Sequence, residues 1–277
     1  MPSPLVSTQW LNDHLDDHNL RLFDASMTKV VGIEPLEYQS LTVIPGAQKM
    51  DLEGALCDLD STQLHALPTP EQFNAFAKLA GLNTDSIVVL YDNQGVYSAP
   101  RAWWLFRVMG VSNVYVLDGG LPRWLADNRS SQTTYNVGSG EGTLLANYQP
   151  QCVCDAQQLL AQLHSPDVAV VDARAAGRFN GQQAEPRAGL RSGHIPGALN
   201  LPFAMLLEQR QYKPVDELAA LLAERVADPS TRLIGSCGSG ITACIVLLAA
   251  AVAGYQNLCL YDGSWADWGA NPELPIE

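Results

Sequence analysis

The segment with the clearest chemical potential is a cysteine that follows an apolar run and precedes two closely spaced glycines. It reads Arg232-Leu-Ile-Gly-Ser-Cys237-Gly238-Ser239-Gly240-Ile241-Thr242-Ala243. The apolar run predicts a buried strand, and the apolar residues after Gly240 predict a helix that begins at about Thr242. We therefore expect Cys237 in a tight loop between a strand and the amino terminus of a helix.

Such a loop favours a reactive thiolate. Glycines let successive backbone N–H groups converge on an anion, and a helix amino terminus adds partial positive charge. A cysteine has an ordinary pKa of about 8.5, and helix amino termini lower it. We expect Cys237 to be a nucleophile; the alternative is a buried structural cysteine, for which the Gly-Ser-Gly sequence has no packing purpose. The residues expected to line the substrate are Gly238, Gly240, Ile241 and Thr242.

The loop carries no positive charge. Cysteine-dependent phosphatases need an arginine six positions after the cysteine to clamp the phosphate. That position is Ala243 here, and no Lys or Arg occurs between Cys237 and Ala253. Phosphoryl transfer is therefore disfavoured, and the neutral loop suits a substrate whose anionic group lies away from the reacting atom.

Three segments of the chain occur twice in the same order. Residues 22–26 match 170–174, residues 44–47 match 195–198, and residues 114–120 match 258–264. The similar spacing predicts two copies of one fold of about 120 residues. Each copy mixes short buried strands with helices, which predicts an α/β domain with a parallel sheet flanked by helices.

The expected strands are Val168–Asp172, Arg232–Gly235 and Leu258–Tyr261, and the expected helices are Pro70–Ala80, Ala156–Leu163, Pro214–Ala227 and Thr242–Ala253. Residues 128–148 are rich in Ser, Thr, Asn and Gly, which is typical of a linker, although a long surface loop has the same composition. We expect domains at 1–127 and 151–277, joined by residues 128–150. Asp92 stands where the first copy would need its cysteine, so we expect that copy to be catalytically silent.

Composition excludes several classes of protein. The chain has 277 residues, 47% of them hydrophobic and 16% charged, which excludes a disordered protein. The 16 basic and 29 acidic residues give a net charge of −13, which disfavours nucleic-acid and anionic membrane partners. The longest apolar stretch, Ile241–Ala253, is about 13 residues, against about 20 needed to cross a bilayer. With no recognisable signal peptide, the six cysteines predict reduced thiols and a cytoplasmic protein.

The loop, the duplication and the segment Gly193-His194-Ile195-Pro196-Gly197-Ala198 together resemble the rhodanese superfamily of two-domain sulfurtransferases. The resemblance covers residues 6–268 and implies two tandem rhodanese-like domains. The loop is similar to that of the branch that uses 3-mercaptopyruvate, with Ile241 as a mild departure from valine. Thiosulfate-using members usually carry Arg-Lys after the cysteine. A thiosulfate sulfurtransferase and a non-catalytic rhodanese-like binding module remain the alternatives.

The resemblance implies that Cys237 takes sulfur from 3-mercaptopyruvate as a persulfide and releases pyruvate. Cyanide or a cellular thiol, including a thioredoxin-like protein, would then accept the sulfur, and no metal or organic cofactor is implied. Arg178 and Arg187 match the carboxylate-binding arginines of the family, within a segment, 177–193, that we expect to be a loop. Arg174 is expected to pair with a nearby acid.

Ser239 is expected to hydrogen-bond the substrate or to help move a proton. In this family a serine–histidine–aspartate relay has been proposed, and His65 matches its histidine. The acid would be Asp51 or Glu53. A surface position is the alternative for His65.

Overall fold

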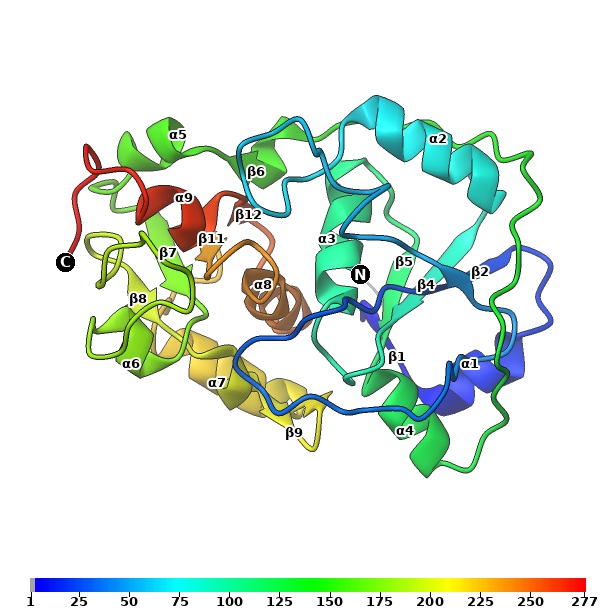
Figure 1. Cartoon of the computed structure of the whole chain (residues 1–277). Coiled ribbons are helices and arrows are strands. Elements are labelled where there is room, and N and C mark those ends of the chain that lie inside the picture. The colour runs from blue at the N-terminus through cyan, green and yellow to red at the C-terminus, as the bar shows by residue number, and fades with distance from the viewer. Residues whose placement is uncertain (1–2) are drawn as a thin grey trace. The chain divides into compact units, whose positions relative to one another are not determined.

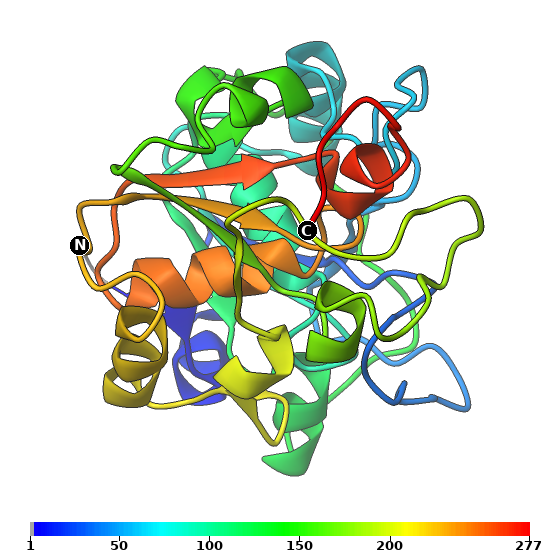
Figure 2. The same cartoon turned by 90° about the vertical axis from the view of Figure 1, so that its left-hand side faces the viewer.

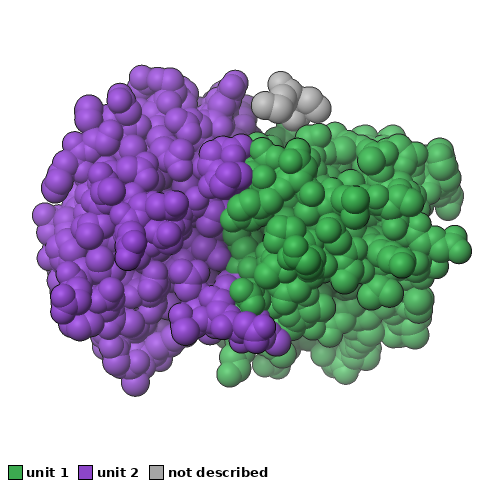
Figure 3. Space-filling model, turned by 90° about the horizontal axis from the view of Figure 1, so that it is seen from above, with its two compact units in different colours: residues 1–58, 67–149, 209–212 green, residues 59–66, 150–208, 213–277 purple. Residues whose placement is uncertain are grey.

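The computed structural model describes residues 3–277, which form two compact units (Figure 3). Unit 1 consists of the described residues up to Asp58, residues 67–149 and residues 209–212. Unit 2 consists of residues 59–66, 150–208 and 213–277. The segment 59–66, which contains His65, thus belongs to the same unit as Cys237, although the sequence places it within the first copy of the repeat.

Unit 1 is built on a parallel sheet with the strand order β1-β5-β4-β2-β3 (Figure 1). Its strands are β1 (Leu5–Val6), β2 (Leu20–Asp24), β3 (Gln48–Lys49), β4 (Ile87–Tyr91) and β5 (Val114–Leu117). Its helices are α1 (Thr8–His14), α2 (Pro70–Ala80), α3 (Ala99–Val108) and α4 (Gly120–Ala126).

Unit 2 is built on a parallel sheet with the order β6-β12-β11-β7-β8. Its strands are β6 (Val153–Cys154), β7 (Val168–Asp172), β8 (Leu199–Asn200), β11 (Arg232–Ser236) and β12 (Leu258–Tyr261). Its helices are α5 (Ala156–Leu160), α6 (Ala176–Phe179), α7 (Val215–Ala223), α8 (Ala243–Val252) and α9 (Ser264–Trp268), with 3-10 turns at Pro150–Cys152 and Phe203–Leu206. Two short strands, β9 (Leu207–Glu208) and β10 (Gln211–Tyr212), lie outside both large sheets.

The two sheets have the same topology. When the strands of each sheet are numbered in chain order, both sheets read 1-5-4-2-3. In this match β4 corresponds to β11 and β5 to β12. The predicted duplication and the predicted fold class, two α/β domains with parallel sheets flanked by helices, are both confirmed.

Helices cover both faces of each sheet. In unit 1, Leu11 of α1 and Trp124 of α4 pack against Leu22 of β2 on one face. The next strand residue, Phe23, points to the opposite face and contacts the ring of Phe76 from α2. In unit 2, α5 and α9 lie on one side of the sheet and α8 on the other (Figure 2).

Most of the expected elements are present with small differences at their ends. Strands β7 and β12 and helix α2 have the expected bounds, and β11 extends one residue further to Ser236. Helices α5 and α7 are shorter than expected, because hydrogen bonds of the i−3 type, such as Gln162 N–H to Leu159 carbonyl, replace the helical pattern at their ends. The expected loop 177–193 begins with three helical residues, so Arg178 lies in α6.

The residues expected to be a linker lie along unit 1. The N–H of Gly142 donates to the carbonyl of Lys78, and a Cβ at Gly142 would lie 2.2 Å from the carbonyl oxygen of Ala77. Glycine is therefore required where this segment passes close to α2. Residues 128–149 are part of unit 1 in the structure, and their composition reflects close backbone contact as well as a connecting role. None of the helices in residues 3–277 has the length and hydropathy needed to cross a membrane.

Candidate active site

Cys237 directly follows β11, the central strand of the unit 2 sheet. Residues 237–242 then form the loop that leads into α8, which begins at Ala243 with Thr242 as its N-cap. Cys237 is 1% exposed and Ser239 is 8% exposed. The predicted strand, tight loop and helix amino terminus are all present, and they hold the thiol at the carboxyl end of a parallel strand, where ligands of such sheets bind.

The loop presents several unpaired backbone donors. Within residues 3–277, no group accepts a hydrogen bond from the N–H of Gly238, Ser239, Ile241 or Thr242. The N–H groups of Cys237 and Gly240, by contrast, both donate to Ser264 Oγ at 3.1 Å. The loop can therefore receive negative charge beside the sulfur without breaking an existing hydrogen bond.

The first residues of α9 form hydrogen bonds with the Cys237 loop. The N–H of Trp265 donates to the carbonyl of Cys237 at 2.9 Å, and the N–H of Ala266 donates to the carbonyl of Gly238 at 3.0 Å. Ser264, which is fully buried, donates its hydroxyl proton to the carbonyl of Tyr261 at 3.0 Å. Five hydrogen bonds thus connect the loop and the end of β12 to residues 264–266.

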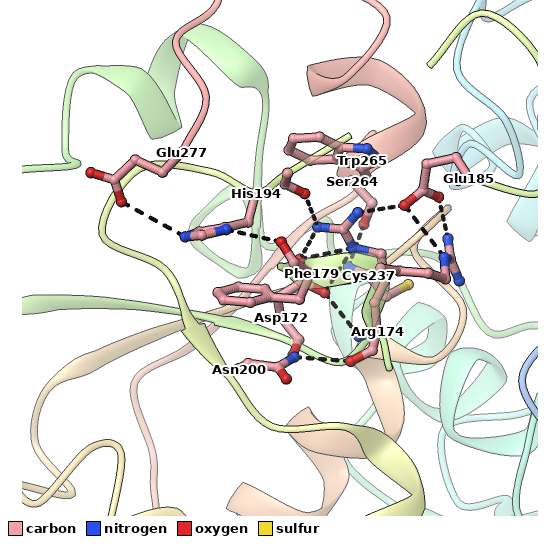
Figure 4. A network of polar contacts seen from close by, with 12 residues as sticks. Asp172, Arg174, Phe179, Glu185, His194, Asn200, Cys237, Ser264, Trp265 and Glu277 are labelled. Carbon is pink, nitrogen blue, oxygen red and sulfur yellow. Dashed lines mark hydrogen bonds and ion pairs between the residues drawn. The ribbon is translucent and has the colours of Figure 1, made fainter. Parts of the chain in front are cut away.

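An ion-pair network lies beside the loop (Figure 4). Arg174 forms an ion pair with Asp172 at 2.7 Å and another with Glu185 at 2.7 Å, and its guanidinium lies 4.3 Å from the ring centroid of Trp265. Arg178 pairs with the second carboxylate oxygen of Glu185. The local ion pair expected for Arg174 is present, and the two arginines and two acids balance each other's charge.

The two arginines predicted to bind a carboxylate have different surroundings. Arg178 lies against the loop, since a Cβ added to Gly238 would be 3.0 Å from Arg178 Nη2, but its charge is already paired with Glu185. Arg187 forms no ion pair within the described residues and lines a pocket of about 480 Å³ in unit 2, together with Gln63 and Asp267. Cys237 is not among the residues that line this pocket.

His65 and Ser239 lie together. His65 Nδ1 is 3.2 Å from Ser239 Oγ, and the backbone of His65 has a φ of 56°, which is uncommon outside glycine. The two acids expected to complete a relay have other partners. Glu53 accepts hydrogen bonds from the N–H and hydroxyl of Thr28, and Asp51 accepts one from the N–H of Glu53.

The equivalent loop of unit 1 is closed by a side chain. Asp92 directly follows β4, and its carboxylate accepts hydrogen bonds from four backbone N–H groups at 2.8–2.9 Å. The donors are Gln94, Tyr97, Ser98 and Ala99. Burial raises the pKa of this fully buried carboxyl group, and the four hydrogen bonds oppose that rise. The donors that a loop of this kind offers to a ligand are therefore occupied in unit 1 by the chain itself.

Sequence reasoning missed two residues of this site. Nothing in the sequence indicated that Glu185 pairs with both Arg174 and Arg178. Ser264 was visible as the last residue of a repeated segment, where the first copy has Gly120, but its role depends on the fold. Among residues 3–277, no cluster of three or more His, Cys, Asp or Glu side chains is arranged to hold a metal ion.

Comparison with known proteins agrees with the duplicated fold. The 3-mercaptopyruvate sulfurtransferase of Escherichia coli strain K12 is 40% identical over 98% of this chain and 97% of its own length. The thiosulfate sulfurtransferase of Rattus norvegicus is 35% identical over 98% of this chain and 94% of its own length. The crystal structure of SseA from Escherichia coli superposes with a TM-score of 0.82 at 39% identity, covering 95% of this chain and 99% of that one. The sequence model of the family of rhodanese-like domains matches this chain twice, at residues 7–127 and 155–271. The chain therefore belongs to the rhodanese family.

Proposed function

We propose that this chain is a sulfurtransferase that takes sulfur from 3-mercaptopyruvate as a persulfide on Cys237 and passes it to cyanide or a thiol. The observation that carries the proposal is the Cys237 loop, which combines a thiol with four unpaired N–H donors and has no cation of its own. Relatives named for this activity match nearly the full length of the chain.

In the first half-reaction the Cys237 thiolate attacks the sulfur of the donor, forming an S–S bond. The donor's C–S bond breaks, and its electron pair passes to the methylene carbon, giving the enolate of pyruvate. One proton added to that carbon completes pyruvate, and Cys237 is left as a persulfide. The unpaired N–H groups of the loop stabilise the negative charge on sulfur in this step.

In the second half-reaction the acceptor attacks the outer sulfur of the persulfide. With cyanide, a C–S bond forms, the S–S bond breaks, and thiocyanate leaves while Cys237 returns to the thiolate. A thiol acceptor becomes a persulfide in the same way. We propose small thiols or a thioredoxin-like protein as the cellular acceptor, and the cytoplasm as the place of action.

Two arginines bind the carboxylate of the donor in this proposal. Arg178 lies against Gly238 and retains donors that Glu185 does not use, since a guanidinium has five N–H groups. Arg187 brings a positive charge that no acid in residues 3–277 pairs with. The neutral loop leaves the charge of the donor to these two side chains, and Gly238, Gly240, Ile241 and Thr242 line the sulfur.

Ser239 and His65 handle the proton in this proposal. At 3.2 Å the imidazole can donate a hydrogen bond to Ser239 Oγ, which leaves the hydroxyl proton of Ser239 to hydrogen-bond the donor's carbonyl oxygen. When Ser239 passes that proton to the enolate, it takes a proton from the imidazole in its place. Residues 151–277 and the segment around His65 supply the chemistry. Apart from the segment around His65, residues 1–127 form a catalytically silent domain, in which Asp92 occupies the loop donors.

The alternative donor is thiosulfate, because a thiosulfate sulfurtransferase is also among the relatives. Steady-state kinetics with both donors, using cyanide as the acceptor and thiocyanate as the readout, separates the two. We expect kcat/KM for 3-mercaptopyruvate to exceed that for thiosulfate by about a hundredfold, since a dianion meets no cation within the loop. A higher kcat/KM for thiosulfate would overturn the assignment of 3-mercaptopyruvate as the donor. If neither donor gave thiocyanate, a non-catalytic binding module would be favoured.

A further inference from the structure

Ser264 occupies a position that the reaction described above does not use. Its hydroxyl oxygen accepts two hydrogen bonds, from the N–H of Cys237 and the N–H of Gly240, both at 3.1 Å. Its hydroxyl proton is directed to the carbonyl of Tyr261. The side chain is completely buried, so these contacts do not exchange with solvent.

The duplicated fold provides an internal reference for this residue. Gly120 of unit 1 corresponds to Ser264 in the repeated segments, and both residues have a φ of 50°. In unit 1 the loop backbone lies directly on the glycine, because a Cβ at Gly120 would be 2.4 Å from the carbonyl oxygen of Asp92 and 2.6 Å from that of Gly95. In unit 2 the corresponding residue is a serine, and its hydroxyl oxygen accepts hydrogen bonds from the loop.

The backbone of Ser264 is strained. A φ of 50° lies in the left-handed region, which glycine adopts readily and other residues adopt at a cost of about 1 kcal/mol. The silent unit has glycine at this position, and the unit with the cysteine has serine. A strained residue that is held in place by three hydrogen bonds is typical of a functional site.

We propose that Ser264 is a positioning residue, which fixes the N–H groups of Cys237 and Gly240 so that the remaining donors of the loop face the sulfur. The proposal rests on the proposed role of Cys237 as the carrier of the persulfide. Because two of the loop's N–H groups are turned toward Ser264, those of Gly238, Ser239, Ile241 and Thr242 stay unpaired. Without the hydroxyl, the N–H groups of Cys237 and Gly240 lose their acceptor, and the donors of the loop are free to turn away from the sulfur.

Two variants separate the hydroxyl from the backbone strain. Ser264→Ala removes the acceptor and keeps the strained Cβ, whereas Ser264→Gly removes both. We expect both variants to lower kcat with 3-mercaptopyruvate by about tenfold or more, because a small displacement of reacting groups has effects of this size. KM should stay within about twofold, since Arg178 and Arg187 bind the donor independently of Ser264. Ser264→Gly should have a higher Tm than Ser264→Ala.

The matched control is Ser236→Ala. Ser236 is also fully buried and directly precedes Cys237, but its hydroxyl has no hydrogen-bond partner among the described residues. Removing the hydroxyl group of Ser236 should therefore leave kcat within about twofold of that of the unmodified enzyme.

The decisive readout is the lifetime of the Cys237 persulfide on preloaded enzyme, followed by mass spectrometry alongside kcat and Tm. We expect the persulfide to be lost several times faster in both Ser264 variants than in Ser236→Ala. A normal kcat and persulfide lifetime in Ser264→Gly would overturn the proposal, because the effect in Ser264→Ala would then be one of stability. A wild-type enzyme that forms no persulfide would instead overturn the role of Cys237, and the positioning role with it.

Discussion

We expect Cys237 to carry the reaction, because its sulfur is the only atom of residues 237–242 that can form the S–S bond. Its N–H donates to Ser264 Oγ, its carbonyl accepts a hydrogen bond from the N–H of Trp265, and neither contact involves the thiol. The side chain can therefore be changed without disturbing the loop.

Replacing the nucleophile should separate activity from folding. In Cys237→Ser we expect sulfur transfer to fall to background while the circular dichroism spectrum stays unchanged, since a hydroxyl cannot hold a persulfide and the volumes are similar. The matched control is Cys244→Ser, which makes the same change at a second buried cysteine, in α8. Residual transfer in Cys237→Ser, together with loss in Cys244→Ser, would place the reactive sulfur elsewhere.

The arginines should act on one half-reaction only. Arg178→Ala and Arg187→Ala should each lower kcat/KM for 3-mercaptopyruvate by about ten- to a hundredfold, as expected for loss of a charge-assisted bond of roughly 1.5–3 kcal/mol. Arg→Lys should restore part of this, because lysine cannot form the planar fork. Transfer from preloaded enzyme to cyanide should hardly change, because cyanide has no carboxylate.

Arg123→Ala is the control for net charge, since Arg123 pairs with Asp127 on the surface of unit 1. If both half-reactions fell equally in the Arg178 and Arg187 variants, these residues would support the fold. The carboxylate would then need another partner.

The loop as an element should set the choice of donor. The double variant Gly238→Arg with Ser239→Lys should raise kcat/KM for thiosulfate and lower it for 3-mercaptopyruvate, because two cations would face a dianion and the Ser239 hydroxyl would be lost. The backbone of Gly238 accepts a side chain, but its Cβ would press against Arg178 Nη2 at 3.0 Å and weaken that contact too. An unchanged ratio of the two kcat/KM values would show that the loop does not control specificity.

The strand, loop and helix around Cys237 were predictable from the sequence because apolar periodicity, glycines and the cysteine lie within twelve consecutive residues. Helix ends were less predictable, since the last turns of α5 and α7 depend on contacts made after the apolar pattern ends. The contact between His65 and Ser239 joins residues 174 positions apart, and the sequence indicated it only through family resemblance. The position of Ser264 needed the fold itself.

Because the fold is duplicated, the chain contains two equivalent loops. Among the described residues, the N–H groups of the Cys237 loop are partly unpaired, whereas those of the loop after β4 are bound by Asp92. Internal repeats predicted two copies, and the two sheets share one strand order. Sequence alone did not predict that Asp92 would bind four N–H groups, because that depends on the path of the loop after β4. It also did not predict that residues 128–149 would lie along α2.

Asp92→Asn should therefore affect stability and spare catalysis. The amide can accept the N–H groups of Tyr97, Ser98 and Ala99, but it turns an NH₂ group toward the N–H of Gln94, which loses its acceptor. We expect the free energy of unfolding of unit 1 to fall by about 1–3 kcal/mol, seen as a lower Tm, with kcat unchanged below that temperature. A variant with normal Tm and reduced kcat would give unit 1 a role in the chemistry.

Single-turnover mass spectrometry tests most directly whether Cys237 carries sulfur as a persulfide. One equivalent of 3-mercaptopyruvate is mixed with the full chain, and the digested protein and released pyruvate are measured before and after cyanide. We predict a gain of about 32 Da on the peptide that contains Cys237, one equivalent of pyruvate, and loss of the added mass as thiocyanate on adding cyanide. Pyruvate release with no added mass on Cys237, or with the mass on another cysteine, would contradict the account.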